Sequence, residues 1–419
     1  METFERWESE VRGYVRAYPT VFQSASNATL VDEAGKSYTD FFAGAGVLNF
    51  GHNNAAMKRA LIEFIESDGV AHSLDMATTV KREFIQTFVD VIMKPRGMDY
   101  RLQFTGPTGT NCVEASLKLA REVTGRRTIV AFSHGFHGMT LGSLACTANE
   151  YFRSAAGVAL DNVIRLPFET APGGGVEQLG EFACALQDPS SGLEPPAAFI
   201  VEAIQAEGGV NVASAEWLKA LQMLARSTGA LLIVDDIQAG CGRTGSYFSF
   251  DGMDLDPDII TLAKGLGGFG TPIAMNMIKP EHDKHWKPGK HTGTFRGQGL
   301  SFVAGRIGLE QFRDDALMTA VKAKGERMRA CLDRIAATHS ERGFAVRGKG
   351  MMQAIDVNDG ELAKAVSKHC FEQGLLVGPC GSGGRVLKLI PPLTIPDEQL
   401  DRGLAILEAA MKSRLEVTT

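Results

Sequence analysis

The stretch that decides the fold is Asp258-Ile-Ile-Thr-Leu-Ala-Lys264-Gly265-Leu-Gly267-Gly268, an apolar run that ends in a lysine and then in glycines. Shortly before it, Leu231-Leu-Ile-Val-Asp235-Asp236-Ile-Gln238 is a second apolar run, and it ends in acid. A lysine that leaves a buried strand can lose enough hydration to become an amine nucleophile, and a carboxylate on a neighbouring strand can keep a ring nitrogen protonated. Pyridoxal phosphate chemistry needs both groups. The alternative explanation is a lysine that only keeps a strand end soluble, with acids that only start a loop.

The same pattern repeats from about residue 100 to residue 280: a short apolar run, a glycine or polar turn, and then a helical stretch. Nearly continuous apolar strands separated by helices predict an α/β fold, in which a mostly parallel central sheet is sandwiched by helices. In such sheets ligands bind at the carboxyl ends of the strands. The predicted strands are residues 101–105, 128–132, 198–202, 230–234 and 259–262.

After about residue 300 the pattern changes to a long polar helix at 314–339 and strand-like runs at 351–357 and 385–390. These features predict a smaller α+β domain, which we expect the N-terminal residues to complete. The predicted division is therefore a large domain at residues 51–305 and a small domain formed by residues 1–50 and 306–419.

The composition indicates a globular protein that acts on small molecules. Its 419 residues are 44% hydrophobic and carry a formal net charge of -6, with no lysine- and arginine-rich run for nucleic acid or a membrane surface. The N-terminus lacks the apolar core of a signal peptide, and no apolar run reaches the roughly 20 residues of a membrane helix, so we expect a cytoplasmic protein. The seven cysteines contain no Cys-x-x-Cys pair and should be mostly buried free thiols.

The run from Thr105 to Asn111 lies where the first predicted strand turns into a helix. Apolar residues at 113, 117, 120 and 123 have helical spacing, so the helix is predicted to begin near Thr110 or Asn111. Its free amides and positive dipole end suit a phosphate, which places Gly109 and Thr110 at the candidate site. An ordinary turn with an N-cap explains the same residues without a ligand.

The run from Ser133 to Gly138 follows the next strand and offers Phe136 as a stacking partner for a flat ring. His134 and His137 could instead bind a metal, but no third ligand cluster has suitable spacing, and loop packing explains them better.

Further polar side chains follow the later strands. Glu202 and Glu207 lie on a glycine loop after the third strand, Gln238 follows Asp235, and Thr294 offers a hydroxyl among free amides. Either glutamate could merely be solvated.

Gly265-Leu-Gly267-Gly-Phe-Gly270 also matches the dinucleotide-binding pattern G-x-G-x-x-G directly after a strand. That fingerprint must open a helix, whereas residues 271–278 read as another strand. A nicotinamide oxidoreductase is therefore the weaker hypothesis.

Taken in order, these motifs closely resemble the class III (ω-) aminotransferases of pyridoxal-phosphate fold type I. The resemblance covers nearly the whole chain, and further matching stretches are residues 40–54, 74–84 and 94–100. Within the family the chain most resembles the branch that makes L-2,4-diaminobutanoate in ectoine biosynthesis.

The resemblance implies roles for the residues around the cofactor. Lys264 would bind pyridoxal phosphate covalently and carry a proton to and from the substrate carbon, and Asp235 would pair with the pyridine nitrogen. Phe136 would stack on the ring with His137 beside it, and Gln238 would approach the phenolic oxygen.

The resemblance extends to the phosphate and to the substrate. Gly109 and Thr110 would bind the phosphate, and Thr294 would reach the phosphate of the neighbouring subunit's cofactor, so a homodimer or a higher homo-oligomer is expected. Glu202 would act from behind the residues that contact the cofactor. Glu207 would neutralise the cation that grips the substrate carboxylate whenever an ω-amine occupies the site.

The chain departs from much of the family in two places. Lys388 stands where an arginine commonly grips an α-carboxylate, and lysine is a point charge without a bidentate fork. Arg385 could compensate, or the amino acceptor could differ. Ala45 lies in a pocket stretch where relatives can carry a bulkier side chain, which leaves room for a different donor.

The expected reaction moves an amino group from L-glutamate to L-aspartate 4-semialdehyde and gives L-2,4-diaminobutanoate and 2-oxoglutarate. The nearest competing hypothesis is another ω-aminotransferase that acts on ornithine, 4-aminobutyrate or a different diamine. More distant hypotheses are a nicotinamide oxidoreductase and an inactive structural homologue. We expect no metal, nucleic-acid or membrane partner.

Overall fold

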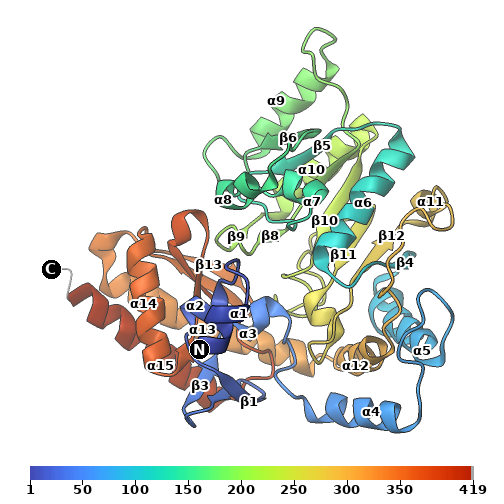
Figure 1. Ribbon diagram of the computed structural model, residues 1–419. Helices are drawn as coiled ribbons and strands as arrows, with labels where there is room; N and C mark the ends of the chain where they lie inside the picture. Colours follow the sequence, from blue (N-terminus) through green and yellow to red (C-terminus); the bar gives the residue numbers. More distant parts are fainter. Residues whose placement is uncertain (417–419) are drawn as a thin grey trace.

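The computed structural model describes residues 1–416 of the chain, and a large mixed sheet forms its centre (Figure 1). The strands of this sheet are β4 (Arg101–Phe104), β5 (Ile129–Phe132), β6 (Val163–Leu166), β7 (Ala198–Val201), β10 (Leu231–Asp235), β11 (Ile259–Leu262) and β12 (Met275–Ile278). They lie in the order β4-β12-β11-β10-β7-β5-β6. The pairs from β11 to β6 are parallel, whereas β12 is antiparallel to both of its neighbours. The predicted mostly parallel sheet is therefore confirmed.

Both faces of the sheet are buried because the strands are apolar at successive positions, and successive side chains point to opposite faces. Ile233 packs with helix α6 (Gly109–Thr124) on one face. Leu232 and Val234 belong to the core on the other face, which includes side chains of α5 (Thr79–Phe88), α9 (Val176–Gln187), α10 (Ala215–Thr228) and α12 (Gly299–Glu310). Each buried side chain of this size contributes roughly 1.5–3 kcal/mol, so the helices on both faces hold the strand ends in fixed positions.

The C-terminal part of the chain forms a second, antiparallel sheet in the order β13-β14-β17-β16. Its strands are β13 (Ala345–Lys349), β14 (Met352–Asp356), β16 (Gly378–Cys380) and β17 (Val386–Leu389). The helices α13 (Ala316–Thr338), α14 (Gly360–Glu372) and α15 (Asp397–Glu416) share a hydrophobic core with it.

The N-terminal strands lie beside this C-terminal part (Figure 1). They are β1 (Phe22–Ser26), β2 (Thr29–Asp32) and β3 (Ser37–Asp40), and β3 pairs in parallel with β15 (Leu375–Leu376). Ala28 and Phe41 are buried in the same core as the C-terminal helices. The two ends of the chain therefore fold against each other.

Helix α6 begins at Gly109 with Thr108 as its N-cap, one residue before the predicted start near Thr110. Two local predictions are corrected by the structure. The predicted strand at 271–278 is regular only over β12, since Pro272 has no amide for a strand ladder. The glycine loop after Glu202 contains a short hairpin of β8 (Ile204–Gln205) and β9 (Asn211–Val212).

The glycine pattern at 265–270 does not open an α-helix. Lys264–Gly267 forms a single 3-10 turn, and the chain then enters β12. The structural condition for dinucleotide binding is therefore absent at this segment. Among the described residues, no helix has both the length and the apolar character needed to cross a membrane.

Candidate active site

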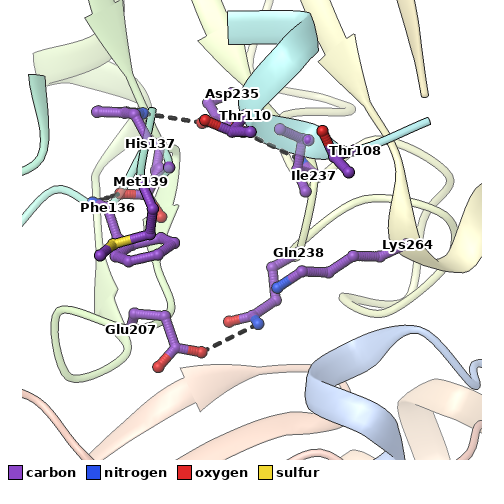
Figure 2. Close-up of a pocket in the computed structure, with 13 residues that line it drawn as sticks. Thr108, Thr110, Phe136, His137, Met139, Glu207, Asp235, Ile237, Gln238 and Lys264 are labelled. Atoms are coloured by element: carbon purple, nitrogen blue, oxygen red, sulfur yellow. Dashed lines mark hydrogen bonds and ion pairs between the residues drawn. The ribbon is translucent and has the colours of Figure 1, made fainter. Parts of the chain in front are cut away.

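A cavity of about 280 Å³ lies at the carboxyl ends of the parallel strands, close to the lower end of the size range of small-molecule sites (Figure 2). It lies between the amino end of α6 and the loops after β5, β7, β10 and β11. The residues that line it are Thr108, Gly109, Thr110, Phe136, His137, Gly138, Met139, Glu202, Glu207, Asp235, Ile237, Gln238 and Lys264. The structure thus brings together all of the predicted cofactor contacts except Thr294. That residue is exposed, and its carbonyl accepts a hydrogen bond from His72 Nε2 at 2.7 Å.

Lys264 is held in an unusual backbone conformation directly after β11. Its φ is 48°, a left-handed value that costs a non-glycine residue on the order of 1–3 kcal/mol. The side chain extends into the cavity toward Gln238 (Figure 2), and within residues 1–416 its Nζ makes no hydrogen bond. Burial lowers the pKa of Lys264 to about 8, although the nearby charge of Glu207 opposes this shift. The amine is therefore free and partly neutral near physiological pH.

Asp235 ends β10 and is fixed by several hydrogen bonds. Its Oδ2 lies 2.8 Å from His137 Nδ1, and both side chains are buried. Its Oδ1 accepts hydrogen bonds from the Thr261 hydroxyl and from the Ile237 amide, each at 3.2 Å. His137 is itself positioned, because its backbone amide donates to the Thr147 hydroxyl at 2.9 Å. The carboxylate cannot turn away from the cavity without breaking these bonds.

The amino end of α6 is open toward the cavity. The side chain of Thr108 does not cap the helix, and the first amides of a helix have no intrahelical acceptor. Two glycines keep this space free. A Cβ at Gly109 would lie 3.0 Å from Ile237, and a Cβ at Gly138, whose φ is +128°, would lie 2.3 Å from the Thr110 hydroxyl. A helix end with free amides and a nearby hydroxyl is suited to a phosphate group.

Phe136 presents its ring to the cavity (Figure 2), and Glu202 holds its backbone. The Phe136 amide donates to Glu202 Oε2 at 2.9 Å. The ring packs edge-on against Phe152 with a centroid distance of 5.6 Å. Burial, and then the charge of Asp235, raises the pKa of Glu202 well above its usual value. Glu202 therefore acts as a neutral hydrogen-bond partner behind the ring.

An ion pair between the buried Lys388 and the partly exposed Glu207 closes one end of the cavity. Lys388 Nζ lies 2.5 Å from Glu207 Oε1 and 3.1 Å from Gln238 Oε1. The Gln238 amide nitrogen donates to Glu207 Oε1 at 3.1 Å and to the Ala45 carbonyl at 2.7 Å. Lys388 and Ala45 do not line the cavity themselves, so they reach it through Gln238.

Both partners of this pair are ionised. Burial alone would raise the pKa of Glu207, yet the charges of Lys388 and Lys264 lower it to about 2. Burial alone would lower the pKa of Lys388, yet the charge of Glu207 raises it. The pair is thus a cation and an anion that a charged substrate group could separate.

Two residues near the site were missed by the sequence analysis. Thr261, which donates to Asp235, was recognisable as the one polar side chain within the apolar run of β11. Tyr14 of α2 (Tyr14–Ala17) also lies near Glu207, since partial burial, and then the charge of Glu207, raises the pKa of this largely exposed side chain. Nothing in the local sequence connects Tyr14 with a glutamate so far along the chain.

The donor set fits pyridoxal phosphate. It offers a phosphate-binding helix end, an aromatic face, an acid for a ring nitrogen and an unpaired amine, all in one cavity. The described residues contain no group of three or more His, Cys, Asp or Glu side chains that could hold a metal ion.

Comparison with known proteins agrees with this geometry. The family described as class III aminotransferase matches residues 12–411, and the chain belongs to this family. It is a pyridoxal-phosphate-dependent enzyme of fold type I.

Individual relatives narrow the comparison. The chain is 51% identical to the diaminobutyrate–2-oxoglutarate transaminase of Bordetella parapertussis, over 99% of this chain and 96% of the relative. It is 48% identical to the enzyme of the same name from Halomonas elongata, over 98% of both chains. Among solved structures, the ornithine aminotransferase of Toxoplasma gondii superposes with a TM-score of 0.85 at 26% identity, covering 99% of this chain and 94% of that one.

Proposed function

We propose that the protein transfers the amino group of L-glutamate to the aldehyde of L-aspartate 4-semialdehyde, giving L-2,4-diaminobutanoate and 2-oxoglutarate. The observation that carries this proposal is the unpaired amine of Lys264, with its pKa near 8, in the same cavity as Asp235 and an open helix end. The names of relatives about 50% identical over nearly the whole chain support the choice of substrates. We place the reaction in the cytoplasm and in ectoine biosynthesis.

When bound, pyridoxal phosphate supplies an aldehyde for amines and a ring that accepts electron density from the substrate carbon. In our proposal Lys264 Nζ holds the cofactor between cycles, and the freed amine then moves the proton at the substrate carbon. Its lowered pKa suits both tasks, since the neutral amine is the nucleophile and the base. Asp235 would keep the ring nitrogen protonated, and its hydrogen bond with His137 would hold the carboxylate in position.

The remaining contacts bind and orient. Gly109 and Thr110 would hold the phosphate at the amino end of α6, and Phe136 would cover one face of the ring. Gln238 would donate to the phenolic oxygen with the amide hydrogen that now bonds Glu207, since the Ala45 carbonyl accepts the other one. We assign Thr294 to the phosphate site of a second subunit in a homodimer, which agrees with its exposure outside the cavity of its own chain.

The Glu207–Lys388 pair would let one site accept both a substrate with a carboxylate at this end and a substrate without one. When glutamate or 2-oxoglutarate places a carboxylate at this end, Lys388 can bind it in place of Glu207. When an ω-amine reacts, that end carries no carboxylate, and Glu207 neutralises the buried cation. Ala45 leaves space beside Gln238, because its side chain is a single methyl group.

The test follows the cofactor spectrum through each half-reaction. The purified protein should have a visible absorption band that disappears in Lys264→Ala and persists in Lys364→Ala, which changes an exposed lysine of α14. L-glutamate should convert the cofactor to its amine form, and L-aspartate 4-semialdehyde should restore the aldehyde form.

A panel of amines separates this proposal from a different ω-aminotransferase activity. Ornithine or 4-aminobutyrate reacting faster than L-2,4-diaminobutanoate would reassign the substrate. A colourless protein whose spectrum glutamate leaves unchanged would refute transamination altogether.

A further inference from the structure

A second, smaller cavity of about 130 Å³ lies between loops of the main sheet and the C-terminal sheet. Its polar lining includes His134, Thr170, Arg347, Asp356, Ser382 and Arg385. None of these residues has a role in the transamination proposed above.

The charges around this cavity are unbalanced. Arg347 Nη2 and Arg385 Nη2 lie 2.9 Å and 3.1 Å from the same atom, Asp356 Oδ2. Asp356 is buried, and it is the only acid among the described residues that line the cavity. Two guanidinium groups thus share one carboxylate, which leaves a net positive charge.

Several hydrogen-bond donors of Arg347 and Arg385 also lack a partner among residues 1–416. The Nε of Arg347 is buried and has no partner in the described part of the chain. An unsatisfied buried donor is costly, and for a charged group the cost is larger still. Within residues 1–416, Arg385 keeps most of its five donors free, since its side chain pairs with Asp356 alone.

The two arginines also affect the protonation of His134. The pKa of His134 is lowered, first by partial burial and then by the charges of Arg347 and Arg385. The imidazole is therefore neutral near pH 7 and can donate one further hydrogen bond without demanding an anion of its own.

The cavity adjoins a groove that borders the active site. A groove of about 500 Å³ shares His134, Gly208 and Ser382 with it, and shares Phe136 and Glu207 with the main cavity. A molecule in this groove would lie next to both the active site and the cavity lined by Arg347 and Arg385.

We propose that Arg347, Arg385 and His134 form a binding site for a small oxyanion, either inorganic phosphate or the carboxylate of a small dicarboxylic acid. The cavity, at about 130 Å³, far exceeds the roughly 10–15 Å³ that one water molecule requires, so a small oxyanion has room in it. The anion would neutralise the second guanidinium and accept hydrogen bonds from the Arg385 donors that Asp356 does not use. This site does not depend on the reaction proposed above.

The test is calorimetric titration of the enzyme saturated with pyridoxal phosphate, so that the cofactor's own phosphate site is filled. Inorganic phosphate and succinate are titrated separately, which distinguishes the two sources of the oxyanion. Arg385→Gln should lower the affinity for the anion by about tenfold or more, as expected for loss of a charged hydrogen-bond donor. Arg385→Lys should retain part of the affinity, because it keeps the charge.

The matched control is Arg226→Gln, which removes a similarly exposed arginine of α10 that pairs with Asp256 and does not line this cavity. Its affinity should equal that of the unchanged enzyme. The proposal is overturned if neither anion binds in the millimolar range, or if Arg385→Gln and Arg226→Gln bind both anions equally well. Melting temperatures of the three variants verify that a loss of binding is not a loss of fold.

Discussion

Replacing Lys388 with methionine tests how the protein would accept two chemically different substrates at one site. The change keeps an unbranched side chain, one heavy atom shorter, but removes the charge that lies 2.5 Å from Glu207 Oε1. A charge-assisted hydrogen bond to a carboxylate is worth about 1.5–3 kcal/mol. At 1.36 kcal/mol per factor of ten, its loss should weaken glutamate and 2-oxoglutarate roughly 10- to 150-fold.

The expected effect is selective. A substrate that reacts through an ω-amine places no carboxylate beside residue 388, so its half-reaction should change little. The measurement is a rapid-mixing titration of each half-reaction, with L-glutamate and with L-2,4-diaminobutanoate, that gives an apparent dissociation constant for each. Lys388→Arg restores a cation and should recover glutamate binding.

Equal losses for both amines would refute this reasoning, because they would mean that the ion pair holds the fold and does not sort substrates. Unchanged glutamate binding in Lys388→Met would refute it as well. Lys364→Met on the surface of α14 is the control for a neutralised lysine outside the site.

Three further predictions concern the cofactor. The pKa of Lys264 falls from 10.5 to about 8, so the rate at which the apoenzyme captures pyridoxal phosphate should rise through pH 8 as the amine loses its proton. The stability of the apoenzyme should also rise between pH 8 and 10.5, because in that range only the unfolded chain keeps the proton. A capture midpoint near 10.5 in a stopped-flow pH series would contradict this. Gly138→Ala places a methyl group 2.3 Å from the Thr110 hydroxyl at a φ of +128°, so the hydroxyl must move. Cofactor affinity in a fluorescence titration should then fall roughly 10- to 150-fold, for the loss of about 1.5–3 kcal/mol of hydrogen bonding to the phosphate, and an unchanged Kd would show that the hydroxyl does not bind phosphate. The raised pKa of Glu202 favours its neutral form, so Glu202→Gln should preserve the acceptor for the Phe136 amide and bind the cofactor normally. Glu202→Ala removes that acceptor and should bind the cofactor about tenfold more weakly. Equal losses in the two variants would indicate that the charge is needed.

β6, whose run Val163–Leu166 includes the charged Arg165, was not predicted. The other strands of the central sheet could be predicted because each is a short, largely apolar run that ends in a turn. The order of the strands could not. β12 lies between β4 and β11, and its pairing with β4 joins Met275 to Phe104, which no local pattern indicates. The β8–β9 hairpin was missed because strands of two residues are too short to show a period. The division of the chain at residues 50 and 305 stays a prediction.

The candidate site was largely predictable for a geometric reason. Lys264, Asp235, Phe136 and Gly109 each follow a strand of one parallel sheet, and the carboxyl ends of such strands meet at one edge. Tyr14 could not be found this way, because it reaches the site from the N-terminal segment and not from that sheet.

In the proposed function, the ion pair would explain how Lys388 can serve where the family resemblance implies an arginine. Lys388 has three donors, and one of them is directed at Gln238 Oε1, an acceptor that does not change when the partner of the cation changes. Gln238 is in turn held by the Ala45 carbonyl. In the proposed cycle a substrate carboxylate would displace only Glu207, so the ammonium group stays anchored while one anion replaces another. Because the Gln238 amide would hold the Lys388 ammonium in place, no bidentate contact with the carboxylate would be needed to position it. Replacement of Glu207 by the substrate carboxylate would then depend on charge more than on the shape of the cation.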